Sequence, residues 1–101
     1  MTNITDVGDL IDIGIVNFIE YMEHISFSEL VVIVKMLEME LGRTSVLKDV
    51  IYIDMERAIE SVDSIEHDKL SRKFVQTYVM EQKIKDRIDI AKDYARRKGV
   101  L

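Results

Sequence analysis

The chain has 101 residues, enough for one domain but too few for two separate hydrophobic cores. Hydrophobic residues make up 48% and charged residues 33%, which is typical of a globular protein and excludes a disordered one. The net charge is −5, and the absence of cysteine excludes disulfides and thiolate metal sites. Because proline is absent and only four glycines occur, the composition favours long helices over a turn-rich β fold.

The N-terminal segment "MTNITDVGDL" carries acids where a secretory signal peptide needs bases. No uninterrupted apolar run approaches the length of a membrane-spanning helix. We therefore expect a cytoplasmic protein that does not enter a membrane.

Charge is distributed unevenly along the chain. Residues 1–68 hold 15 acids and 4 bases, whereas residues 69–101 hold 4 acids and 10 bases. An acidic body with a basic C-terminal third allows three interpretations: a self-complementary contact, a nucleic-acid-binding helix, or a docking site for an acidic partner.

The first predicted helix runs from about Asp6 to Glu23. Ile13 and Val16 widen its apolar face beyond what one packing partner covers, so it is either a central core helix or a helix shared between protomers. Its apolar residues recur at helical spacing, at Val7, Leu10, Ile11, Ile15, Phe18, Ile19 and Met22.

A second helix is predicted to begin after Ser26. Ser26 can cap it, and Glu29, three residues on, completes a capping box, with Ile25 and Leu30 placed as a hydrophobic staple. Gly42 predicts its end. The helix is apolar nearly all round, so we expect it to be the most buried element.

Residues 45–66 allow two interpretations. Thr44 or Ser45 can cap a short helix that ends near Ile51, and Asp54 can then cap another helix over Met55–Glu66. The alternative is a single helix over residues 45–66, because no strong breaker lies between them.

From Lys69 to about Lys98 the spacing predicts one long helix. Glu81 and Gln82 interrupt its apolar face, and "FVQTYV" at 74–79 also has strand propensity. The apolar face consists of Leu70, Phe74, Tyr78, Ile84, Ile88, Ala91 and Ala95.

Two consecutive segments carry a family resemblance. "ISFSELVVIVKMLE", followed by "VLKDVIYIDMERAIESVDSIEHDKLSRK", resembles the central part of MarR-type winged-helix regulators, over about residues 25–73. The helix-turn-helix frame falls on Leu47, Ile51, Ile53, Asp54, Ala58, Val62, Ile65 and Leu70.

The resemblance implies a dimer whose interface is formed by the first and last helices, with the Met55–Glu66 helix in the DNA major groove. Leu70–Met80 contains no Gly, Asn, Asp or Pro that could turn a hairpin, so a wingless variant is implied.

DNA contacts would have to come from few residues. Arg57 is the candidate for reading bases, while Lys69, Arg72 and Lys73 are candidates for phosphate contacts. Four acids in the same region, Glu56, Glu60, Asp63 and Glu66, would repel phosphates.

The sequence contains no residue pattern that is typical of a catalytic site or a metal site. His24 and His67 each follow an acid by four residues, but neither has the glutamate three residues before it that a di-iron bundle uses. The glycines are isolated, so no phosphate-binding loop is present, and there is no cysteine nucleophile. We expect a protein that is not an enzyme and has no cofactor or metal.

The sequence thus predicts one all-α domain over residues 1–101. It has four to five helices, a helix-turn-helix-like core and a long C-terminal helix. Our first functional hypothesis is a small dimeric helix-turn-helix regulator that binds duplex DNA. The alternative is a non-catalytic helical-bundle adaptor or inhibitor that binds a protein partner, which the net acidity and wide apolar faces favour.

Overall fold

A computed structural model describes residues 6–99, and these residues form four helices. They are α1 (Val7–Asp12), α2 (Ile15–His24), α3 (Phe27–Glu60) and α4 (Ser64–Gly99). No strand occurs within these residues, so the predicted all-α fold with a long C-terminal helix is confirmed. None of the four helices combines the length and apolar character needed to cross a membrane.

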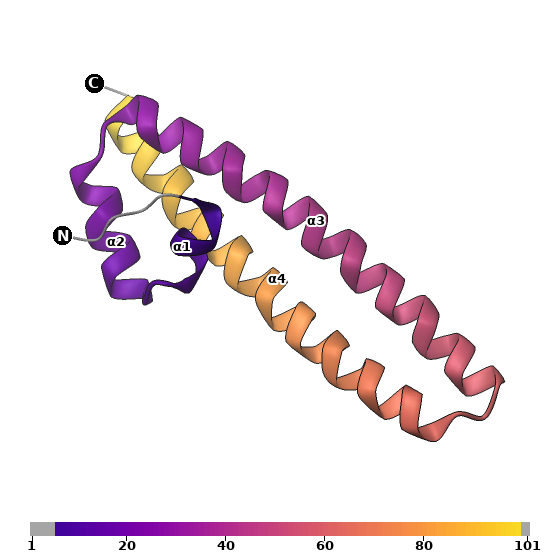
Figure 1. Cartoon of the computed structure of the whole chain (residues 1–101). Helices are drawn as coiled ribbons and strands as arrows, with labels where there is room; N and C mark the ends of the chain where they lie inside the picture. Colours follow the sequence, from indigo (N-terminus) through magenta and orange to yellow (C-terminus); the bar gives the residue numbers. More distant parts are fainter. Residues whose placement is uncertain (1–5, 100–101) are drawn as a thin grey trace.

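The molecule is built on a long antiparallel hairpin of α3 and α4 (Figure 1). Helices α1 and α2 are short and pack beside the end of the hairpin where α3 begins and α4 ends. The other end projects beyond them as a two-helix arm, which gives the chain its elongated dimensions of 58 × 25 × 18 Å. We call the covered half of the hairpin the proximal half and the projecting half the arm.

The hairpin is held together by a seam with the spacing of a coiled coil. On α4 the inward residues alternate between three and four positions apart, from Leu70 through Glu81 to Ala91. This spacing keeps one face of each helix turned toward its partner. On α3 the inward residues include Leu30, Leu37, Thr44, Ile51 and Ala58.

Two apolar clusters lie along this seam. The larger one fills the proximal half, where Phe18 and Met22 of α2 reach Leu37 of α3 and Ile84 of α4. The smaller one stabilises the arm and consists of Ile51, Ala58 and Leu70, with Met55 and Phe74 packed against them. A polar layer separates the two clusters.

The prediction of one helix over residues 6–23 is wrong, because the chain bends between α1 and α2. Ile13 adopts an extended backbone and Gly14 begins the next helix. The bend turns two carbonyls, those of Leu10 and Ile13, toward the guanidinium of Arg87 on α4. The donor lies on the last helix, far from the bend in sequence, so local spacing could not reveal it.

The start of α3 agrees with its predicted cap. The Ser26 hydroxyl accepts a hydrogen bond from the Glu29 backbone N–H at 3.3 Å, and the helix begins at Phe27. The predicted stop at Gly42 is wrong, because α3 continues through it. An interior glycine costs only about 1 kcal/mol relative to alanine. Leu37 and Thr44 are buried in the seam on either side of it.

The prediction of two helices within residues 45–66 is also wrong, and the single helix predicted there ends earlier. Helix α3 runs unbroken to Glu60, so Asp54 lies inside it instead of capping a new helix. The reversal follows at Val62, which has a φ of 57°. Asp63 then caps α4 by accepting from the Glu66 N–H at 3.0 Å.

Candidate functional site: an apolar stripe on the outer side of α3

The polar layer of the seam is a hydrogen-bonded cluster centred on Glu81. Its carboxylate accepts from Ser45 Oγ at 2.7 Å and from Lys48 Nζ at 3.0 Å, and Lys85 Nζ lies 3.6 Å away. The Ser45 hydrogen bond, followed by that of Lys48, lowers the pKa of Glu81 despite desolvation. Because every group of the cluster has a partner, it has the character of a structural layer and not of a catalytic pair.

Two bases of the C-terminal third, Arg87 and Lys98, hold the N-terminal helices against α4. Arg87 donates to the carbonyl oxygens of Leu10 at 3.0 Å and Ile13 at 2.6 Å, and stacks over the Phe18 ring at 5.4 Å. Lys98 satisfies the C-terminal carbonyls of α2, donating to Met22 at 2.9 Å and also to Glu23 and Ile25. These two cations are therefore not available for a nucleic acid.

The residues predicted to contact DNA lie at the tip of the arm. Arg57 is near the end of α3, and Lys69, Arg72 and Lys73 are in the first turns of α4, all exposed. Arg57 lies 3.8 Å from Asp54 on its own helix. The helix break that a helix-turn-helix places near Ile53 is absent, because that residue is within α3.

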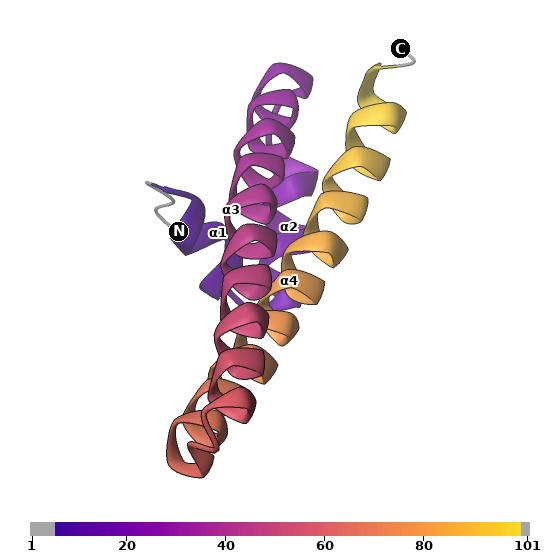
Figure 2. The same cartoon turned by 90° about the vertical axis from the view of Figure 1, so that its right-hand side faces the viewer.

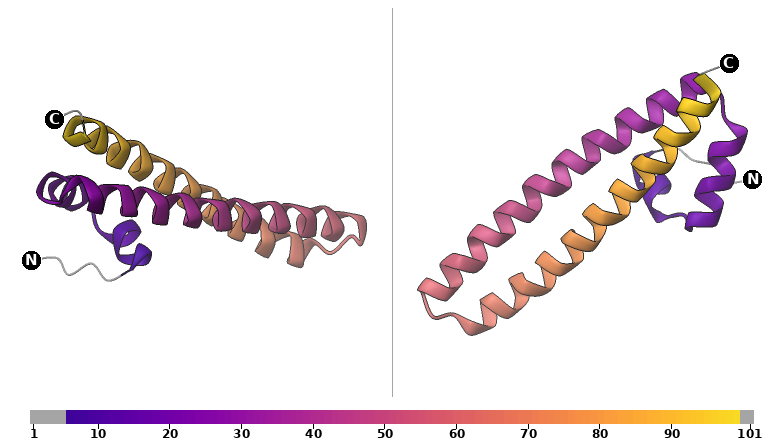
Figure 3. Two further views of the ribbon diagram at one scale, coloured as in Figure 1. Left: turned by 90° about the horizontal axis from the view of Figure 1, so that it is seen from above. Right: turned by 180° about the vertical axis from the view of Figure 1, so that it is seen from behind.

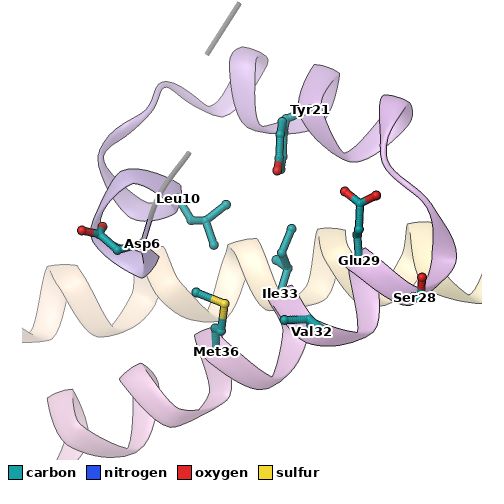
Figure 4. Close-up of a pocket in the computed structure, with 8 residues that line it drawn as sticks. All are labelled: Asp6, Leu10, Tyr21, Ser28, Glu29, Val32, Ile33 and Met36. Atoms are coloured by element: carbon teal, nitrogen blue, oxygen red, sulfur yellow. The ribbon is translucent and has the colours of Figure 1, made fainter. Parts of the chain in front are cut away.

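A cleft of 380 Å³ lies between the N-terminal helices and α3 (Figure 4). Tyr21 reaches into it from α2, while Ile33 and Met36 form its floor on α3. Its two carboxylates belong to helix caps: Asp6 accepts from the Asp9 N–H, and Glu29 accepts from Ser26 Oγ. The cleft therefore offers packing space and no assembled set of acid, base and nucleophile. Within residues 6–99 no three His, Cys, Asp or Glu residues are grouped to hold a metal ion.

The most unusual surface is an apolar stripe on the outer side of α3. Val46 and Ile53 are separated by one heptad, and Met39 lies one heptad before Val46. With Val50 they occupy a line that faces away from the seam with α4. These four side chains, which we call the α3 stripe, are between 48% and 63% exposed.

Charged residues surround the α3 stripe and are predominantly acidic. Residues 38–60 carry six acids and three bases. Of the bases, Lys48 is engaged with Glu81, while Arg43 and Arg57 pair with acids of their own helix at 3.1 and 3.8 Å. The surroundings of the stripe therefore present net negative charge to anything that approaches it.

The prediction that a helix from Ser26 to Gly42 would be the most buried element is wrong, because Phe27, Val32 and Met39 within it are exposed. The apolar residues of this helix lie on two of its faces. One face packs in the seam against α4, and the other is exposed. The seven-residue spacing of Met39, Val46 and Ile53 is readable in the sequence. Spacing alone cannot distinguish a core position from an exposed one, because that depends on the length of the helix and on the projecting arm.

Comparison with models of known protein families, with curated proteins and with solved structures gave no match to this chain.

Proposed function

We propose that this chain is a non-catalytic helical adaptor or inhibitor that binds a protein partner through the α3 stripe. The observation that carries this proposal is the run of exposed aliphatic side chains at Met39, Val46, Val50 and Ile53 on the outer side of α3, from the proximal half into the arm.

The physical argument starts from the cost of exposing apolar surface. A soluble monomer seldom presents a long contiguous apolar patch unless another molecule covers it. Val46, Val50 and Ile53 are four and three residues apart and Met39 lies one heptad before Val46, which is the pattern by which one helix packs along another. A helix laid along α3 would bury these side chains, and each fully buried aliphatic side chain contributes about 1.5–3 kcal/mol.

The surrounding charge defines the chemistry of that partner helix. Asp49 and Glu56 lie beside the stripe and have no ion pair within residues 6–99, and Glu60 follows at its end. A helix with one apolar face flanked by lysines or arginines would match both the stripe and its charge. We therefore propose a basic amphipathic helix as the bound element.

DNA binding by the predicted cations has less support in this geometry. Arg57, Lys69, Arg72 and Lys73 lie at one end of the arm, but Glu56, Glu60 and Glu66 lie in the same region. Phosphate binding depends on a surplus of cations, which this end does not offer. The continuous α3 also provides no separate recognition helix.

The test is site-specific photocrosslinking in cells that express the chain. A photoreactive residue at Val50 is expected to give one discrete protein adduct, whose crosslinked peptide belongs to a basic amphipathic helix. The matched control is the same residue at Val16, which is 72% exposed but lies on α2, away from the stripe. Adducts that are the same from both positions would contradict the proposal.

A second measurement separates the two functional hypotheses. Fluorescence anisotropy with the crosslinked peptide is expected to show binding that weakens as salt rises and disappears when Val50 becomes Asp. A pool of random duplex DNA in low salt is expected to show none. Duplex binding that is lost on replacing Arg57 and Lys73 by Gln would instead support the DNA-binding hypothesis.

A further inference from the structure

A second uncovered surface lies on the face of the hairpin opposite α1 and α2. In the view from above, these two helices lie against one face of the hairpin, and no other helix formed by residues 6–99 covers the opposite face (Figure 3). Figure 2 shows the molecule from the end of the arm, with α1 and α2 behind α3 at the proximal end. We call this bare surface the open face.

A groove of 500 Å³ opens on this face in the proximal half. Its floor is apolar and is formed by Phe27, Val31 and Val34 of α3 together with Ala95 of α4. No residue of α1 or α2 lines it, which is consistent with its place on the opposite side of the hairpin. The groove has room for more than one aliphatic side chain from outside.

The charged residues beside the groove are mainly basic. Lys35, Lys92 and Arg96 line it, against one acid, Glu38. None of these three cations forms an ion pair within residues 6–99. The occupant is therefore expected to combine apolar side chains with carboxylates.

The heptad repeat extends the open face into the arm. Val31 and Glu38 line the groove, and the positions that follow them every seven residues on α3 are Ser45, Tyr52 and Ile59. Tyr52 and Ile59 are exposed, at 50% and 61%. The arm therefore continues the same face with apolar side chains.

The charge of the open face reverses along its length. The positions two and three heptads after Lys35 are Asp49 and Glu56, and Asp68 lies four heptads before Arg96 on α4. Lys48, two heptads after Val34, is the base that the repeat places on the open face of the arm. Its charge is already paired with Glu81 and does not offset these acids. The proximal half instead carries Lys35, Lys92 and Arg96, which are unpaired within residues 6–99, against Glu38 and Asp89, while Lys85, like Lys48, lies beside Glu81. One end is basic and the other is acidic.

We propose that the open face binds a second copy of this chain, turned end for end about a twofold axis at the level of Ser45 and Glu81. These two residues mark the middle of the hairpin, because their side chains bond across the seam at 2.7 Å. The rotation places the acidic arm of each copy over the basic groove of the other, which is the isologous contact of a symmetric dimer.

Residue positions along the helices agree with this pairing. Ile59 lies two heptads after Ser45 and Val31 lies two heptads before it, so the exposed Ile59 of one copy is level with the groove of the other. Glu56 lies about three helical turns after Ser45, and Lys92 lies about three turns after Glu81, so these opposite charges are also level. The same twofold rotation thus brings Ile59 level with the groove and Glu56 level with Lys92.

The area is sufficient for a stable dimer. A helix of 34 residues is about 51 Å long and two neighbouring helices are about 20 Å wide, so the face measures roughly 1,000 Å². A standard interface needs about 800 Å² on each partner. The resulting assembly would be a bundle of four long helices, with the short helices on the outside.

This dimer goes beyond the proposed function and uses other apolar side chains, and Asp49 and Glu56 lie on the border between the two surfaces. The α3 stripe points away from the seam and would stay accessible in the dimer, so each copy could still bind a partner helix. If the chain did not dimerise, the Val50 crosslinking and the Val50→Asp binding measurement would still test the proposed function separately.

The test begins with mass measurement by analytical ultracentrifugation and continues with crosslinking. The chain is expected to sediment as a dimer of two 11.8 kDa copies. Because native cysteine is absent, the variants Val31→Cys and Ile59→Cys each carry one thiol. Mixing them with a short bis-maleimide is expected to join Val31→Cys of one copy to Ile59→Cys of the other. Neither variant alone is expected to crosslink efficiently.

Charge reversal provides the second arm. Glu56→Lys is expected to weaken dimerisation about tenfold, and adding Lys35→Glu with Lys92→Glu in the same chain is expected to restore it. Val16→Cys mixed with Ile59→Cys serves as the crosslinking control. The proposal would be overturned if the chain were a monomer at all concentrations, or if Val31→Cys crosslinked to Val31→Cys of the other copy. It would also be overturned if Lys35→Glu with Lys92→Glu failed to restore the dimerisation that Glu56→Lys weakens. A monomer whose groove instead binds a fatty acid or a peptide would also overturn it.

Discussion

Lys48 and Glu81 form an ion pair inside the seam of the hairpin, with Lys48 Nζ 3.0 Å from Glu81 Oε1. The carboxylate is almost fully buried, while the Lys48 side chain keeps 24% of its exposure. The pair lies between the two apolar clusters of the hairpin. Such a layer aligns two long helices, because sliding α3 by one heptad would replace Lys48 beside the carboxylate with Leu41 or Met55, neither of which carries a charge.

Replacing Glu81 by Gln is therefore expected to destabilise the fold by about 2 kcal/mol at neutral pH. Removing one partner of a buried pair leaves the other charge uncompensated, which costs about 3–5 kcal/mol when both are fully buried, and Lys48 is partly solvated. Urea unfolding followed by circular dichroism measures the change. Glu20→Gln, on the exposed side of α2, is the matched control and is expected to change stability by less than about 0.5 kcal/mol.

Replacing both partners together, Lys48→Met with Glu81→Leu, is expected to leave stability unchanged or to raise it. Buried ion pairs are often no more stabilising than apolar residues of similar volume, because desolvation opposes the attraction. A double variant as unstable as Glu81→Gln would contradict this expectation. It would mean that the ion pair itself stabilises the fold, and that Glu81→Gln does not destabilise it merely by leaving the Lys48 charge uncompensated.

The stability conferred by Glu81 is expected to depend on pH. The hydrogen bond from Ser45, followed by that from Lys48, depresses the pKa of Glu81 below its ordinary value of 4.5. A carboxylate with a depressed folded-state pKa stabilises the fold above its unfolded pKa, and this contribution is lost as pH falls from there through the folded pKa. The difference in unfolding free energy between the wild type and Glu81→Gln should thus be constant near neutral pH and shrink below about pH 4.5. A difference that grows with acidification would contradict the assigned direction.

How far the sequence can predict the fold is clear from particular residues. The cap at Ser26 and the long last helix are predictable, because a cap depends on neighbours and a repeat depends on spacing. The bend at Ile13 is not predictable, because it is stabilised by Arg87 from the other end of the chain. The predicted stop at Gly42 is wrong because a local helix preference of about 1 kcal/mol is outweighed by the seam packing on either side.

The candidate site is predictable only in part. Wide apolar faces indicate protein binding, but the location of the stripe depends on the length of α3, since a helix ending at Gly42 would have no arm. In the sequence, Glu81 interrupts the apolar face of the last helix. It lies in the seam because Ser45 and Lys48, which belong to the other long helix, supply its partners.

Arg87 is expected to attach the N-terminal helices to the hairpin. Replacement by Met would leave the carbonyl oxygens of Leu10 and Ile13 without their donor, at a cost of about 2–4 kcal/mol. Hydrogen exchange is expected to accelerate mainly in residues 7–24, while the arm stays protected. Arg72→Met removes an exposed arginine from the same helix and is expected to leave exchange unchanged. Uniform acceleration over both helices of the hairpin would contradict a local role for Arg87.

The α3 stripe is expected to contribute little to folding. Replacing Val46 and Ile53 by Gln removes two half-exposed aliphatic side chains and introduces residues of better helix propensity, so the unfolding free energy should stay within about 0.5 kcal/mol of wild type or rise. Leu37→Ala, in the seam of the same helix, is the contrast and should cost about 2–5 kcal/mol, because Leu37 is fully buried. The same Gln double variant is expected to lose binding of the partner helix and to reduce the fluorescence of an apolar dye. Thermal unfolding and dye binding check both. A stripe variant as unstable as Leu37→Ala would mean that these side chains pack within the fold, and the surface would lose its role in binding.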